Sequence, residues 1–208
     1  MKTEERKDFD REAAAWDQDP GRVKLANDVA DAIIRESGPN GTMDVLDFGC
    51  GTGLVTLRLQ PLVRTITGAD SSKGMLGVLE EKIRTLGLPN VRTQYVDFEQ
   101  GECVEGKFHL LISSMTLHHV PNTAVLFKQW YNLLLPGGVL AAADLDAEDG
   151  SFHVDPDERA IVLQGFHRDE LAARAAAAGF VDVTFSDVWE IPKNDQVYGV
   201  FLLVARHP

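Results

Sequence analysis

The stretch DVLDFGCGTG, residues 44–53, decides the fold of this chain of 208 residues. An apolar run of Val45, Leu46 and Phe48 leads directly into three glycines, and a helical pattern begins at Leu54. This order predicts a strand, a glycine turn and a helix start. Glycine lets the backbone turn tightly and lets a ligand come close, because no Cβ stands in the way. The helix N-terminus behind the turn presents unpaired N–H groups, so the unit is suited to hold a nucleotide-like ligand at the end of a sheet.

Apolar strands and helical patterns alternate after this unit, which implies right-handed crossovers and a parallel sheet. Only residues 192–196 separate the last two strand-like runs, and so short a connection requires an antiparallel hairpin. The expected fold is therefore α/β, a three-layer αβα sandwich whose seven-stranded, mostly parallel sheet has one antiparallel strand in a C-terminal hairpin. The strands are expected at residues 44–48, 65–70, 91–96, 108–113, 139–144, 181–191 and 197–205, and the helices between them at 72–86, 123–135 and 169–178.

Two segments lie outside this alternation. Residues 1–38 are polar and helical in character, and they are predicted to form an N-terminal helical lid over the main domain at 39–208. Residues 145–168, rich in Asp, His and Glu, are too long for a simple connector, and long connections often act as lids or binding loops. They are predicted to be a lid-like insertion.

The overall composition narrows the classes of partner. The net charge of −12 argues against nucleic acid, since phosphate binding calls for clustered Lys and Arg. The apolar runs are too short to span a membrane, and the N-terminus is too polar for a signal peptide, so a cytoplasmic protein without a membrane partner is expected. No motif specifies an oligomeric state.

The motif VLDFGCGTG, residues 45–53, resembles the signature of Rossmann-like (class I) S-adenosylmethionine-dependent methyltransferases. The dinucleotide fingerprint is G-x-G-x-x-G, whereas this chain has G-x-G-x-G with Asp47 two residues before the first glycine. A carboxylate at this position would repel a pyrophosphate. It would instead offset the positive charges of a cofactor that carries an ammonium and a sulfonium group. Asp70 lies 21 positions after Gly49, ends the second strand and resembles the family's ribose-binding acid. The alternative interpretation is that Asp70 is a solvated residue at the end of a strand.

Further segments carry the resemblance over residues 40–205. Val96-Asp97-Phe98 resembles the adenine site, residues 113–119 resemble the segment that faces cofactor and acceptor, and LLPGG at 134–138 resembles an architectural loop. The resemblance implies S-adenosylmethionine as cofactor and S-adenosylhomocysteine as product. It implies cofactor contacts by Asp47, Gly49, Cys50, Gly51, Gly53, Asp70, Ser71, Met75, Asp97, Phe98, Ser113 and Ser114. For Cys50, a small residue that merely fits the turn is the alternative.

The acceptor side is predicted less directly. The N-terminal stretch resembles the leading helix of the small-molecule members, and Trp16 is therefore predicted to line a substrate pocket, although it could equally anchor the helix. His118 and His153 are also predicted to line this pocket. His118 and His119 are the candidate catalytic bases, and as neighbours they are expected to point in different directions. Structural packing is the alternative for each. The histidines and acids of the insertion match no metal-ligand spacing, so no metal site is predicted.

Together these features favour an enzyme that transfers a methyl group from S-adenosylmethionine to a small-molecule acceptor. Two alternatives stay open. A nicotinamide-dependent oxidoreductase would use the same turn and Asp70. However, the chain lacks a third glycine at the spacing of the dinucleotide fingerprint. A binding module that retains the cofactor without catalysis would have the same motifs.

Overall fold

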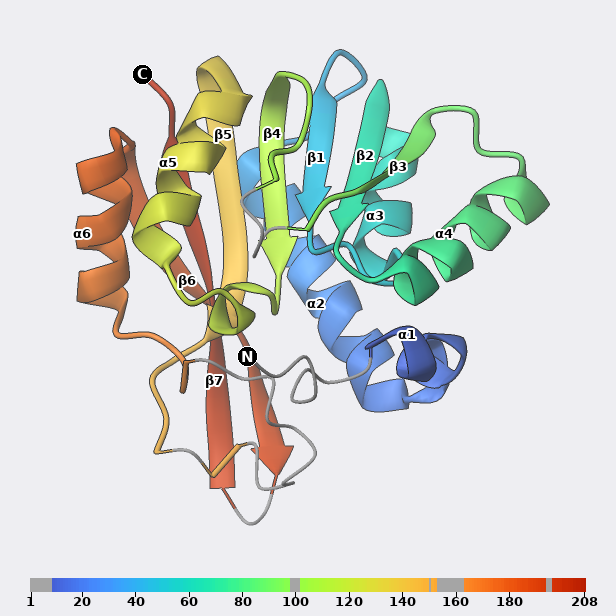
Figure 1. Ribbon diagram of the computed structural model, residues 1–208. Coiled ribbons are helices and arrows are strands. Elements are labelled where there is room, and N and C mark those ends of the chain that lie inside the picture. The colour runs from blue at the N-terminus through green and yellow to red at the C-terminus, as the bar shows by residue number, and fades with distance from the viewer. Residues whose placement is uncertain (1–8, 98–101, 150, 153–162, 194–195) are drawn as a thin grey trace.

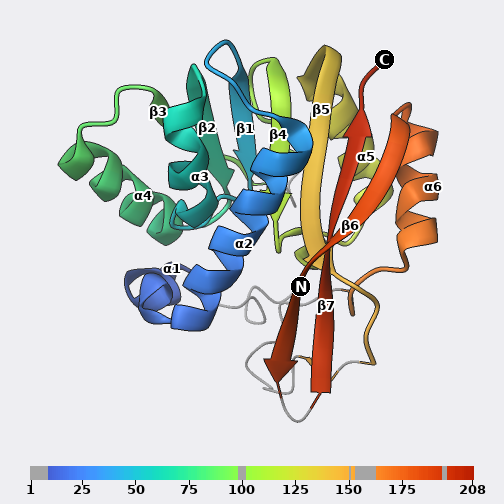
Figure 2. The same cartoon turned by 180° about the vertical axis from the view of Figure 1, so that it is seen from behind.

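A computed structural model describes residues 9–97, 102–149, 151–152, 163–193 and 196–208. Its sheet has seven strands in the order β3-β2-β1-β4-β5-β7-β6 (Figures 1 and 2). All neighbouring strands are parallel except β7, which is antiparallel to both β5 and β6. The predicted mostly parallel sheet with one reversed strand in a terminal hairpin is thereby confirmed. The strands are β1 Asp44–Phe48, β2 Thr65–Asp70, β3 Val91–Tyr95, β4 Phe108–Ser114, β5 Leu134–Leu145, β6 Val181–Lys193 and β7 Gln196–Arg206.

Helices cover both faces of the sheet and complete the three layers. Helices α2 and α3 pack on one face, and α5 and α6 pack on the other (Figures 1 and 2). The central strands are apolar on both sides, as expected of parallel strands covered twice. The helices are α1 Phe9–Glu12, α2 Pro20–Ser37, α3 Leu54–Leu59, α4 Lys73–Leu86, α5 Thr123–Leu133 and α6 Arg168–Ala178, with 3-10 turns η1 Ala13–Gln18, η2 Gln60–Leu62 and η4 Leu117–His119.

Helix boundaries follow local capping chemistry. Helix α4 is capped by Ser72, whose Oγ accepts from the Met75 N–H at 3.1 Å. Helix α2 begins at Pro20 behind Asp19, whose carboxylate accepts from the Gly21 N–H at 2.7 Å. Gly87 ends α4 with a φ of 64°. These caps fix where each helix meets the sheet edges.

The largest departure from the predicted boundaries lies between the helix at 123–135 and the strand at 139–144. The helix at 123–135 ends at Leu133, and β5 starts at Leu134 rather than at residue 139. Leu134 pairs with Phe108 of β4, after which the register shifts before Leu110 pairs with Val139. The Pro-Gly-Gly segment therefore bulges within a strand, where the sequence pattern indicates only a loop.

The carboxyl ends of the parallel strands lie together at the lower edge of the sheet in Figure 1, and the N-terminal helices begin at the same edge. Both segments predicted to be lids join this region. The described ends of the 145–168 insertion pair with each other, since the Ala147 N–H donates to the Phe166 carbonyl at 3.0 Å. Among the described residues, no helix has the length and apolarity to cross a membrane.

Candidate functional site

The glycine turn after β1 is held against β2 by backbone hydrogen bonds. Gly49, Gly51 and Gly53 have φ values of 73°, 53° and 85°, a region that side chains disfavour. The N–H groups of Gly49 and Cys50 both donate to the Ala69 carbonyl, at 2.8 and 3.1 Å. The turn is therefore a rigid part of the sheet edge.

The three glycines face different surroundings. A Cβ on Gly49 would lie 2.2 Å from Oγ1 of Thr116, and one on Gly53 would lie 2.4 Å from Leu79. A Cβ on Gly51 would meet no atom of the described residues within 4 Å. Gly49 and Gly53 thus allow close packing within the chain, whereas Gly51 leaves backbone open to a ligand.

Asp47 lies beneath this turn and is 1% exposed. Its Oδ2 accepts a hydrogen bond from Thr56 Oγ1 at 2.5 Å. Burial, opposed by that hydrogen bond and assisted by the nearby Asp70 charge, raises the pKa of Asp47 to about 7. No Lys, Arg or His among the described residues forms an ion pair with it. A ligand ammonium would supply the missing positive charge.

Asp70, at the end of β2, accepts two backbone hydrogen bonds. Oδ2 accepts from the Gly51 N–H and Oδ1 from the Ser72 N–H, each at 2.8 Å. Burial raises the pKa of Asp70 against the lowering effect of these bonds. Each carboxylate oxygen keeps a further lone pair, so the group can also accept from ligand hydroxyls.

Three other predicted cofactor residues surround the turn. Cys50 is buried against Gly68 of β2, and burial raises the pKa of its thiol. Met75 is buried at the start of α4, and Ser71 is exposed beside it. The packing of Cys50 fits its interpretation as a small residue that fills the turn.

The remaining predicted cofactor residues lie just after β3 and at the end of β4. Asp97, two residues after β3, is buried, and its N–H donates to Glu102 Oε2 at 2.8 Å, while Phe98 lies outside the described residues. Ser113 is fully buried, and its hydroxyl donates to the Phe48 carbonyl at 2.9 Å. Ser114 is partly exposed. The structure thus uses the Ser113 hydroxyl to join β4 to β1.

The N-terminal helices are tied to the same edge by two carboxylates. Asp10 accepts from Ser72 Oγ at 2.6 Å and from the Gly74 N–H at 2.7 Å. Asp17 accepts from the hydroxyl of Thr52, inside the glycine turn, and pairs with Lys82 of α4, each at 2.5 Å. No local sequence pattern indicates these contacts, because they join residues far apart in the chain.

Aromatic rings connect the N-terminal segment to the segment after β4. The Phe9 ring meets Trp16 at 5.8 Å and His119 at 5.3 Å between centroids. The rings of His118 and His119 lie 4.1 Å apart, contrary to the expectation that these neighbours diverge, because they share a tight 3-10 turn. Trp16, His118 and His119 therefore belong to one aromatic group, which Arg22 extends by stacking 3.8 Å from Trp16.

His118 also contacts a buried acid that is not among the predicted site residues. Nδ1 of His118 lies 2.6 Å from Oδ1 of Asp144, the penultimate residue of β5. Both side chains are buried, Asp144 completely. An acidic residue ending an otherwise apolar strand was the available signal, but its partner depended on the strand order.

The acceptor-side prediction for His153 falls outside the described residues. The described start of the insertion lines a cavity of about 190 Å³ with Tyr198 and Gly199 of β7. Among the described residues, no three His, Cys, Asp or Glu side chains cluster as metal ligands would.

The arrangement suits a ligand that carries a positive charge and hydroxyl groups. An open glycine, a buried carboxylate that lacks a cation and a strand-end carboxylate with spare lone pairs all face one sheet edge. In open α/β sheets, ligands bind outside the carboxyl ends of the strands, where the strand order reverses. Here β1 lies between β2 and β4, so its turn is at that reversal.

Comparison with known proteins agrees with this geometry. Residues 45–138 match the methyltransferase domain family. An uncharacterized methyltransferase of Schizosaccharomyces pombe is 33% identical over 152 residues, which cover 69% of this chain and 53% of that protein. A trans-aconitate 2-methyltransferase of Deinococcus radiodurans is 41% identical over 101 residues, covering 47% of this chain and 36% of that protein.

A solved structure extends the match to the fold. The phosphoethanolamine N-methyltransferase 2 of Haemonchus contortus, in complex with S-adenosyl-L-methionine, has a TM-score of 0.74 and 16% identity, covering 96% of this chain and 60% of that chain. The chain belongs to the Rossmann-like (class I) S-adenosylmethionine-dependent methyltransferases. It spans about half the length of the S. pombe relative.

Proposed function

We propose that this chain transfers a methyl group from S-adenosylmethionine to a small-molecule acceptor. The observation that carries the proposal is the open backbone at Gly51 between the buried carboxyl group of Asp47 and the partly buried carboxyl group of Asp70. A pyrophosphate would meet two acids there, whereas a ligand with an ammonium group and ribose hydroxyls would satisfy both.

Three carboxylates would hold the cofactor. Asp47 faces the ammonium group, Asp70 accepts from the ribose hydroxyls, and Asp97 accepts from the exocyclic amine of adenine. The bound cofactor supplies a methyl carbon made electrophilic by its sulfonium. The chain then has to position the acceptor and exclude water, and positioning of this kind contributes about 7–11 kcal/mol in favourable cases.

Residues 1–38 act in this proposal as a lid, joined by the insertion at 145–168. Supporting contacts run from Asp10 to the start of α4 and from Asp17 to Thr52 in the glycine turn. On the other side, the Leu163 N–H donates to the His118 carbonyl at 3.1 Å. A lid bonded to the turn itself would keep water from the reacting atoms.

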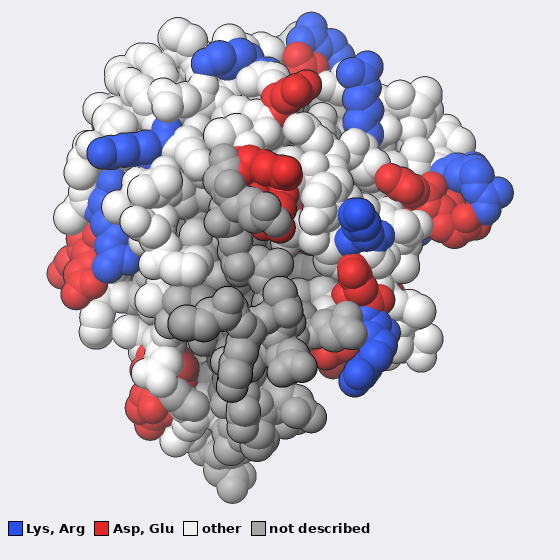
Figure 3. Space-filling model, in the orientation of Figure 1, with Lys and Arg blue, Asp and Glu red and all other residues white. Residues whose placement is uncertain are grey.

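A small acceptor is favoured over nucleic acid by charge. The net charge is −12, and on the face shown in Figure 3 the described Lys and Arg side chains are scattered among acidic ones. A polyanion would be attracted only weakly to such a surface. The trans-aconitate methyltransferase among the relatives also points to a small acceptor.

Titration calorimetry with S-adenosylmethionine, S-adenosylhomocysteine and NADH tests the proposal. We expect both adenosyl compounds to bind with a Kd between about 1 μM and 1 mM and NADH not to bind. Release of labelled methyl to a panel of small acceptors then tests turnover. NADH binding alone would favour the oxidoreductase, and tight cofactor binding without turnover on any acceptor would favour the non-catalytic module.

A glycine pair separates ligand contact from backbone strain. Gly51→Ala places a Cβ in the open space, so we expect cofactor affinity to fall at least tenfold. Gly87→Ala is the matched control, because Gly87 has a similar φ of 64° and equally open surroundings at the end of α4. Both variants cost about 1–2 kcal/mol of stability from the positive φ. Equal affinities in the two variants would contradict a ligand at Gly51.

A further inference from the structure

The buried contact between His118 and Asp144 has a defined proton geometry. Oδ1 of Asp144 lies 2.6 Å from His118 Nδ1 and also accepts from the Leu145 N–H at 2.8 Å, while Oδ2 faces the His118 N–H at 3.4 Å. An ionised carboxylate only accepts hydrogen bonds, so Nδ1 carries the proton. Nε2 is then the acceptor nitrogen of the neutral ring.

This pair lies between the glycine turn and the lid. Thr116, two residues before His118, approaches Gly49 so closely that a Cβ on Gly49 would collide with it. On the other side, His118 meets His119, which meets Phe9 of the lid. The imidazole therefore belongs to the short segment that links the glycine turn to Phe9.

The components match those of a base and its orienting group. Asp144 is the penultimate residue of β5, and its carboxylate accepts from the backbone N–H groups of Leu145 and His118, so it cannot rotate freely. His118 is held by the η4 turn and by the Asp144 contact. A base oriented by a third group, at hydrogen-bond distance, is the arrangement that proton abstraction requires.

We propose that Asp144 is a positioning residue that sets His118 as the general base, and that the acceptor therefore carries a proton on the atom that is methylated. This inference rests on the proposed methyl transfer. The acceptor's X–H proton passes to His118 Nε2 as the X electron pair forms the bond to the methyl carbon. The electron pair of the broken methyl–sulfur bond stays on sulfur, giving the neutral thioether, and Asp144 offsets the charge of the imidazolium until its proton returns to water.

The acceptor class follows from this balance. Hydroxyl, thiol and protonated amine groups need such a base, whereas an ionised carboxylate or a tertiary amine is methylated without proton loss. The pair thus favours protic acceptors over carboxylates.

Ring ¹⁵N NMR of the ligand-free protein tests the geometry without turnover. We expect His118 to be the Nδ1–H tautomer. His109 is an internal control, since its Nδ1 accepts from the Asp44 N–H at 3.1 Å, which requires the Nε2–H tautomer. An Nε2–H tautomer at His118 would overturn the proposal.

Two variants test the role in turnover. Asp144→Asn keeps the oxygen that Nδ1 and Leu145 contact but removes the charge, and we expect kcat with a protic acceptor to fall about 10²-fold. His118→Asn is the second variant, because its amide nitrogen replaces Nδ1 as donor to Asp144 while Nε2 is lost. For both, the Kd of S-adenosylhomocysteine should stay within about twofold of the wild-type value, as should every parameter of the control His109→Asn.

The outcomes separate this inference from the proposed function. Unchanged kcat in a folded Asp144→Asn or His118→Asn variant overturns the base assignment while methyl transfer stands. Absence of cofactor binding in the wild-type protein overturns both. Equal losses of kcat on protic acceptors and on carboxylates would show a merely structural role and overturn the inference.

Discussion

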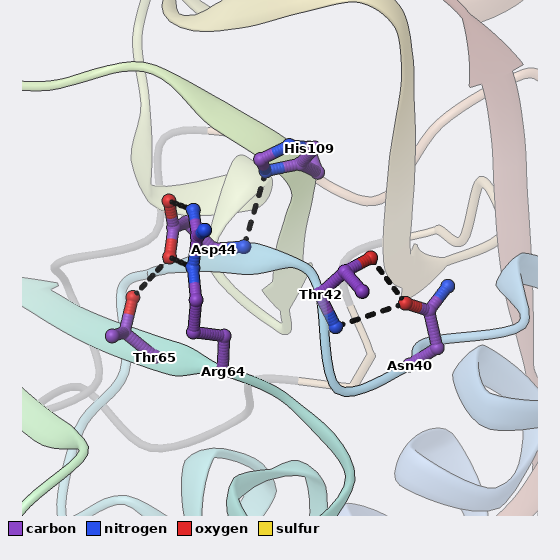
Figure 4. Close-up of polar contacts among 6 residues, drawn as sticks. All are labelled: Asn40, Thr42, Asp44, Arg64, Thr65 and His109. Carbon is purple, nitrogen blue, oxygen red and sulfur yellow. Dashed lines mark hydrogen bonds and ion pairs between the residues drawn. The ribbon is translucent and has the colours of Figure 1, made fainter.

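The two ends of strand β1 each carry an aspartate, and the two are treated in opposite ways. Asp44, at the amino end, accepts hydrogen bonds from Arg64 through both carboxylate oxygens, and Arg64 Nε lies 2.8 Å from Oδ1 (Figure 4). The Thr65 hydroxyl also donates to Oδ1, at 2.7 Å. These bonds hold its pKa at about 2. Asp47, at the carboxyl end, has Thr56 as hydrogen-bond donor and a pKa raised to about 7.

This contrast indicates which edge of the sheet supplies its own countercharge. At the amino edge the chain supplies its own countercharge, and Thr42 and Asn40 close the adjoining turn with a 3.0 Å N–H bond (Figure 4). At the carboxyl edge, negative charge is buried without an ion-pair partner for Asp47 among the described residues. Burying a charge without a partner costs stability, so such a site is costly unless a ligand completes it.

Replacing the two aspartates should produce opposite effects, and this is the largest effect we expect. Asp47→Asn removes the charge that faces the cofactor ammonium, so cofactor affinity should fall roughly 10- to 150-fold, the equivalent of about 1.5–3 kcal/mol. Its melting temperature at pH 8 should rise, because the unpaired buried charge is gone. Calorimetry and thermal denaturation measure the two effects.

Asp44→Asn is the matched variant at the amino edge. It should leave cofactor affinity unchanged and lower stability by at most about 1 kcal/mol, since Arg64 is more than half exposed and the pair is screened. If Asp44→Asn weakened cofactor binding as much as Asp47→Asn, the contrast between the edges would be wrong.

The same contrast predicts opposite pH dependences. The pKa of Asp47 is raised from 3.8 to about 7, so its contribution to stability is full below about pH 4 and is lost as the pH rises to 7. The pKa of Asp44 is lowered to about 2, so its contribution is present above about pH 4 and is lost as the pH falls to 2.

Cofactor binding should therefore release a proton near neutral pH. Affinity should rise between pH 6 and 8, by up to about tenfold per unit below pH 7, because the ammonium prefers ionised Asp47. Calorimetry at pH 6.5 in buffers of different ionisation enthalpy measures the released proton. If proton release persisted in Asp47→Asn, the released proton would come from another group.

The smallest expected effect concerns the lid. Asp17→Asn weakens the bonds to Thr52 and Lys82, so cofactor dissociation should accelerate severalfold while stability falls by about 1 kcal/mol or less. Asp28→Asn, which removes an exposed pair with Lys24 within α2, is the control and should not change the dissociation rate. Stopped-flow measurement of S-adenosylhomocysteine release compares them, and equal rates would argue against a lid at 1–38.

Most of the fold was predictable because its signals are local. The strand Asp44–Phe48, the turn glycines and the cap at Ser72 depend on near neighbours in the chain. The start of β5 at Leu134 could not be predicted, because Pro136 and the two glycines after it indicate a loop. Only pairing with Phe108 makes this segment a bulged strand. Local propensity cannot report a partner that is distant in the sequence.

The βα unit at residues 44–59, the alternation that builds a parallel sheet and the family motif can all be read from the chain alone, since apolar periodicity and glycine spacing are properties of consecutive residues. The folded arrangement adds that Asp44 has a cation partner and Asp47 lacks one among the described residues, that Asp17 reaches the glycine turn, and that Asp144 contacts His118. Those contacts depend on strand order and helix docking, which bring together side chains that no local pattern relates.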